Sequence, residues 1–158
     1  MVDVDLQRPV KTKRISDNFA AHLKRGSATP GVDYVTPVGE TIYACERGIV
    51  VSASNNPNSG AGRNITIRHR DGSRTIYFHL SVVKVRALQR VKQGQVIGLT
   101  GNSGTQTTGP HLHFAIQQKG KFVDPEKVFR KEKREARAEK AAALTVETMT
   151  PTHEIIPG

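Results

Sequence analysis

The chain has 158 residues, a length that suits one compact domain with a short appendage. Its formal net charge of +10 favours polyanionic partners, although the same basic balance can simply keep a small protein soluble. A single cysteine, Cys45, excludes an intramolecular disulfide, and no apolar stretch approaches the roughly 18 residues that span a bilayer.

Residues 1–14 show no hydrophobic period and are predicted to form a basic N-terminal arm. From residue 15 to residue 129, short β-prone runs alternate with turn residues, without the spacing of βαβ units. This pattern predicts a mainly β domain built on a compact antiparallel sheet. The predicted strands include residues 42–54, 65–68, 75–80, 82–86, 96–99 and 112–117. Cys45 lies in the first of these and is predicted to be a small core residue.

The composition changes at Asp124. Asp124, Pro125 and Glu126 are typical of an N-cap, a first helical position and an acidic first turn. Residues 130–144 are rich in Lys, Arg, Glu and Ala, which favour helix but leave little apolar surface to bury. We therefore predict a solvated charged helix and a flexible or partner-bound tail over residues 130–158, outside the β domain of residues 15–129.

Four side chains of the predicted β domain could serve a metal. His111 and His113 are two residues apart in a predicted strand, so their side chains point to the same face. Taken alone, such a pair is more often two surface histidines on a strand. His79, near the end of another predicted strand, and Asp33, after a Pro-Gly turn, favour the metal interpretation. Zinc hydrolases take three ligands from His, Asp and Glu and keep one position for water.

The ordered motifs of residues 15–129 resemble the lysostaphin/LytM-type zinc endopeptidases, the glycyl-glycine and beta-lytic family. The motifs include Gly31-Val32-Asp33-Tyr34, Ile76-Tyr77-Phe78-His79-Leu80, Gly101-Asn102-Ser103-Gly104, Gly109-Pro110-His111-Leu112-His113-Phe114 and Val123-Asp124-Pro125. The resemblance implies a compact antiparallel β fold with zinc in a groove between loops. It also implies hydrolysis of the peptide cross-links of bacterial peptidoglycan.

The resemblance assigns roles by matched position. Asp33 and His113 would be zinc ligands, His111 would be the general base, and His79 would orient or stabilise the transition-state oxygen.

One position departs from the family pattern. The family's first ligand histidine lies four residues before the aspartate, where this chain has Thr29. A neutral hydroxyl is a poor zinc ligand, so either the site is degenerate or another histidine takes the place. A degenerate domain would only bind peptidoglycan or serve as a structural virion module. We favour His22, which precedes an Arg-Gly-Ser sequence as in some phage-type members of the family.

The expected partner is a peptidoglycan peptide, with phage virion or tail proteins contacting the C-terminal tail. Because the first residues lack an apolar segment, we expect no signal peptide, synthesis in the cytoplasm and action at the cell wall after release or delivery. No nucleic-acid-binding motif is present, so that function is not expected. His69 precedes a predicted hairpin turn and is expected on the sheet surface, and His153 lies in the tail. Neither is assigned a role.

Overall fold

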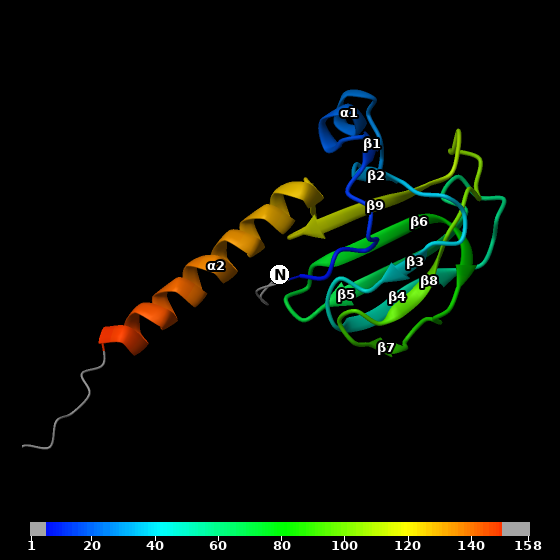
Figure 1. Ribbon diagram of the computed structural model, residues 1–158. Helices are drawn as coiled ribbons and strands as arrows, with labels where there is room; N and C mark the ends of the chain where they lie inside the picture. The colour runs from blue at the N-terminus through cyan, green and yellow to red at the C-terminus, as the bar shows by residue number, and fades with distance from the viewer. Residues whose placement is uncertain (1–5, 150–158) are drawn as a thin grey trace, which may run out of the picture.

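The structure, a computed structural model, describes residues 6–149 of the chain, with side chains to residue 145. The described residues form ten strands and two helices (Figure 1). They are β1 (Ile15–Asp17), α1 (Phe19–Lys24), β2 (Val32–Val35), β3 (Thr41–Tyr43), β4 (Gly48–Ser54), β5 (Arg63–His69), β6 (Arg74–Val83), β7 (Arg90–Val91), β8 (Val96–Thr100), β9 (His111–Gln118), β10 (Lys121–Val123) and α2 (Pro125–Met149).

The strands form one sheet in the order β1-β2-β9-β6-β5-β4-β7, with β10 beside β9 and β8 bridging β6 and β3. Every pairing is antiparallel. In β9 the side chains of Leu112, Phe114 and Ile116 are fully buried, as their alternation predicts. The predicted mainly β, antiparallel fold is confirmed.

Cys45 is fully buried, which confirms its prediction as a core residue, and burial raises the pKa of its thiol to about 12. The prediction for His69 is wrong, since only 3% of this residue is exposed. Its Nδ1 lies 2.9 Å from the carbonyl oxygen of Arg47 and its Nε2 lies 2.8 Å from the Thr75 hydroxyl. Because both ring nitrogens have partners, the imidazole can be buried without a large penalty.

The N-terminal segment differs from the expected arm. Residues 6–14 lie against the sheet, where the Gln7 amide donates to the Cys45 carbonyl and the Tyr43 amide donates to the Pro9 carbonyl. Val10 is only 2% exposed, so its burial attaches this segment to the core. Residues 1–5 lie outside the described residues.

Helix α2 begins at Pro125, as the Asp124-Pro125-Glu126 pattern predicts, with the Asp124 carboxylate accepting from the Glu126 amide. Its first two turns pack on the domain, where Phe129 and Glu132 are buried. The helix then extends away from the sheet (Figure 1). Its side chains from Lys133 to Thr145 are exposed apart from the half-buried Ala136. Neither helix of the described part is long and apolar enough to cross a membrane. The predicted tail, with His153, lies outside the described residues from position 150 onward.

Candidate metal centre

Strand pairing brings the central residues of the site together. Strand β9 lies between β2 and β6, and His113 is the register partner of Asp33 on one side and of Phe78 on the other. His113 Nδ1 is 2.8 Å from Asp33 Oδ1, and His111 Nε2 is 3.6 Å from the same oxygen. His111 and His113 therefore point to one face of β9, as their spacing predicts.

His22 reaches the same carboxylate from the short helix α1. The helix is N-capped by Asn18, whose side-chain oxygen accepts from the Ala21 amide at 2.8 Å. Gly26, with a φ of +70°, reverses the chain after the helix, a conformation that suits glycine. His22 is 3% exposed, and its Nε2 lies 3.3 Å from Asp33 Oδ2. His22, Asp33 and His113 each offer one atom that could bind a metal, and these three atoms lie within 4.8 Å of one another.

Each of the four site histidines is oriented by a backbone carbonyl that lies within hydrogen-bonding distance of one ring nitrogen. The pairs are His22 Nδ1 with Asn18 at 2.9 Å, His79 Nδ1 with Ser103 at 2.8 Å, His111 Nδ1 with Gly109 at 2.7 Å, and His113 Nε2 with Thr29 at 2.8 Å. A neutral imidazole carries one N–H, which these carbonyls accept. The second nitrogen of each ring is then left with a free lone pair, and those of His22, His111 and His113 face Asp33.

Thr29 contributes to the site through its backbone. Its carbonyl holds the ring of His113, whereas the sequence comparison with the family concerned only its side chain. Sequence reasoning missed this contact and the helix that carries His22. The Asn18 N-cap could have indicated that helix, because Asn before an Ala-rich turn is a helix-start signal.

His79 has an unusual backbone conformation. Its φ of +68° is in the left-handed region, which is costly for a residue with a Cβ atom. Its amide donates to the Ala61 carbonyl, and this bond together with the Ser103 contact holds the conformation. The His79 and His111 ring centroids are 4.9 Å apart, so both imidazoles lie on the same side of the site.

The electrostatics of the cluster favour a charged carboxylate. Burial opposes ionisation of Asp33, but the hydrogen bonds that His113 and His22 donate when their rings are protonated outweigh it and hold the pKa of Asp33 well below its usual range. Burial also lowers the pKa of His22, but Asp33 and the Asn18 carbonyl outweigh it and raise that pKa. Burial lowers the pKa of His79 to about 4, which favours a neutral ring.

This donor set fits zinc. His22 and His113 each have an acceptor oxygen near both ring nitrogens, but a neutral ring can donate to only one of them. The remaining nitrogen lone pair of each ring therefore faces the negative Asp33 carboxylate, which is repulsive. A cation placed between the two lone pairs and the carboxylate would attract all three. Two imidazoles and one carboxylate are also the ligand types that catalytic zinc takes. The cluster forms part of the wall of a cavity of about 740 Å³, a volume that holds a short peptide segment.

Residues 27–125 match the profile of Peptidase family M23, and the chain belongs to this family, whose members are zinc metallopeptidases. The peptidoglycan DD-endopeptidase ShyA of Vibrio cholerae is 39% identical over 122 residues, which cover 73% of this chain and 28% of ShyA. The chain thus spans less than a third of the length of that relative. His22 precedes the matched region.

Solved structures agree with the assignment. A zinc containing peptidase from Vibrio cholerae superposes with a TM-score of 0.64 at 34% identity, covering 76% of this chain and 39% of that one. The catalytic domain of the antimicrobial peptidase lysostaphin from Staphylococcus simulans superposes with a TM-score of 0.59 at 29% identity, covering 79% and 91%. The resemblance inferred from the motifs and the lysostaphin-like fold are confirmed.

Proposed function

We propose that this chain is a zinc-dependent endopeptidase that hydrolyses the peptide cross-links of bacterial peptidoglycan. Zinc would be held by His22 Nε2, the Asp33 carboxylate and His113 Nδ1. The observation that carries the proposal is the convergence of these three donors within 4.8 Å, on rings that backbone carbonyls hold in place. Membership of family M23 supports the reaction class.

Zinc, when bound, would supply Lewis acidity that activates water and polarises a carbonyl oxygen. The Gly109 carbonyl orients His111, so its neutral ring offers Nε2 as a proton acceptor. His111 is therefore the proposed general base for the attacking water. His79 has the same arrangement, with Nδ1 at the Ser103 carbonyl and a pKa lowered to about 4, so its neutral ring also offers Nε2 as a hydrogen-bond acceptor. We propose that it orients the reacting oxygen by accepting a hydrogen bond from the attacking water.

A second function is favoured by one observation, the Thr29 side chain at the usual position of the first ligand histidine. In that case the groove would bind wall peptides without hydrolysing them. The position of His22 argues against this alternative, because its Nε2 supplies an imidazole donor beside Asp33 from another segment of the chain.

Metal content and activity, measured on the same sample, separate the two functions. The chain would be purified without chelators, its zinc determined by elemental analysis, and its action on purified peptidoglycan followed by chromatography of the released fragments. About one zinc per chain with release of new peptide ends supports the proposal. Zinc-free protein that binds peptidoglycan without cleaving it would refute the enzyme and support the binding module. His113→Ala is the matched inactive control.

A phage origin, delivery by a virion and attachment through the C-terminal tail remain predictions, as does action at the cell wall after synthesis in the cytoplasm. Mass spectrometry of purified virions from a host that carries this gene would test the first three together. Absence of the chain from virions would contradict delivery by a virion. A phage lysin that is released on lysis would then be the prediction that stays.

A further inference from the structure

An ion pair in the wall of the cavity stands beside the proposed ligands. Arg25 Nη1 pairs with Asp17 Oδ2, and both residues line the cavity that contains His22 and Asp33. Arg25 caps the C-terminus of α1, three residues after His22, and Asp17 on β1 is the register partner of Asp33. The pair therefore adjoins two of the three proposed ligands, His22 three residues earlier in the chain and Asp33 on the adjacent strand.

Arg25 is the one lysine or arginine among the described residues that line this cavity. Its side chain is 53% exposed, compared with 32% for Asp17, so Arg25 remains accessible although it is paired. A guanidinium has five N–H groups in a fixed planar arrangement, and a contact through Nη1 leaves others for a second anion. Asp17 restrains the side chain and so reduces the entropy lost on binding that anion.

From this arrangement we infer that Arg25 binds a free carboxylate of the peptide substrate near the scissile bond and makes the site selective for peptides that carry it. This inference rests on the proposed peptidase function. Arginine is the side chain best suited to hold a carboxylate through paired hydrogen bonds. Arg25 is thus assigned a role in substrate specificity, distinct from the roles of the zinc ligands.

The test compares two synthetic cross-link peptides. One carries a free α-carboxylate on the residue after the scissile bond, and the other carries a carboxamide there. Charge-assisted hydrogen bonds contribute about 1.5–3 kcal/mol in proteins, which corresponds to roughly a 10- to 100-fold effect. Because Arg25 is half exposed, we expect an effect at the lower end of this range. The wild-type kcat/KM should be about tenfold higher for the carboxylate peptide than for the carboxamide peptide, because its KM is lower.

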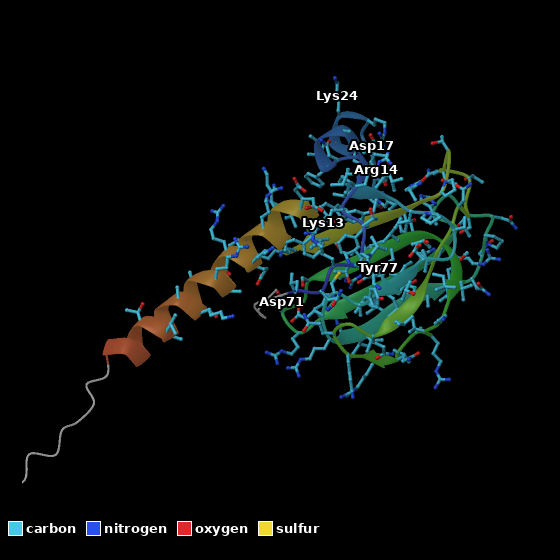
Figure 2. The ribbon with its side chains drawn as sticks, viewed as in Figure 1. Lys13, Arg14, Asp17, Lys24, Asp71 and Tyr77 are labelled. Carbon is cyan, nitrogen blue, oxygen red and sulfur yellow. The ribbon has the colours of Figure 1, made fainter. Side chains whose placement is uncertain are left out.

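Arg25→Gln should abolish this preference, and Arg25→Lys should retain part of it. Lys24→Gln is the matched control, because it removes the same charge from the neighbouring position of α1. Lys24 does not line the cavity, and Figure 2 shows it pointing away from the sheet. Zinc content is measured for every variant, so that displacement of His22 is detected separately from loss of substrate contacts.

Binding gives a second measurement that does not depend on cleavage. NMR titration of the metal-free wild type should show tighter binding of the carboxylate peptide than of the carboxamide, and Arg25→Gln should bind both equally. Equal binding of the two peptides by the wild type would overturn the inference. Equal cleavage of the two by the wild type would also overturn it. Loss of zinc and of all cleavage with the binding preference intact would instead count against the proposed function alone.

Discussion

The two parts of helix α2 are expected to contribute differently to the stability of the domain. The part up to about residue 133 should stabilise it, whereas the part beyond should contribute little. The test uses two truncated chains, residues 1–124 and residues 1–133. Loss of the whole helix removes Phe129, which is 6% exposed and stacks on Phe114 with ring centroids 6.0 Å apart. The guanidinium of Arg8 also lies over the Phe129 ring, 4.7 Å from its centroid. Replacing a buried phenylalanine by alanine typically costs about 3–5 kcal/mol.

The same truncation removes Glu126, which accepts two hydrogen bonds from Arg8 at 2.9 Å and one from the Tyr34 hydroxyl at 2.8 Å. Tyr34 is fully buried, so its hydroxyl would lose its partner at a cost of about 1–3 kcal/mol. The combined loss of about 4–8 kcal/mol is comparable to the total stability of a small domain, about 5–15 kcal/mol. The chain of residues 1–124 should therefore unfold at a much lower urea concentration than the full chain.

The chain of residues 1–133 keeps all these contacts and should lose about 1 kcal/mol or less, because the described side chains it removes are almost all exposed. Urea unfolding followed by circular dichroism measures both truncations, and hydrolysis of soluble wall fragments tests whether the shorter helix suffices for activity. An unchanged midpoint for residues 1–124, or an unfolded chain for residues 1–133, would refute the reasoning.

Three further predictions concern the histidines. His113→Ala should lose zinc, whereas His111→Ala should keep it and lose about 10²–10⁴-fold in hydrolysis, and equal metal release by both would show that the roles are wrongly divided. In a His22→Ala background, Thr29→His should restore zinc, as measured by elemental analysis, and failure would show that the backbone at Thr29 holds its side chain away from the site. Burial lowers the pKa of His69 from 6.5 to about 4, so between these values the unfolded chain binds a proton that the folded chain does not. Stability should thus be full above pH 6.5 and fall by up to about 3 kcal/mol toward pH 4, and urea unfolding at several pH values should show a weaker pH dependence for His69→Gln than for the wild type.

Much of the site could be predicted from local sequence. Two-residue spacing places His111 and His113 on one face of a strand whatever the rest of the chain does, because successive side chains of a strand alternate. Asp124 and Pro125 likewise mark the start of α2 by their own capping chemistry. These predictions needed only the preferences of neighbouring residues.

Tertiary structure decided the rest, because the partners involved are far apart in the chain. The carbonyl of Thr29 orients His113, 84 residues later, and Arg8 pairs with Glu126 across 118 residues. His69 is buried because partners outside its own strand take both ring nitrogens, which a pattern of neighbouring residues cannot show. The sequence alone predicted the central strands and the candidate ligand types, whereas only the tertiary position of α1 decided that His22 brings its side chain to Asp33.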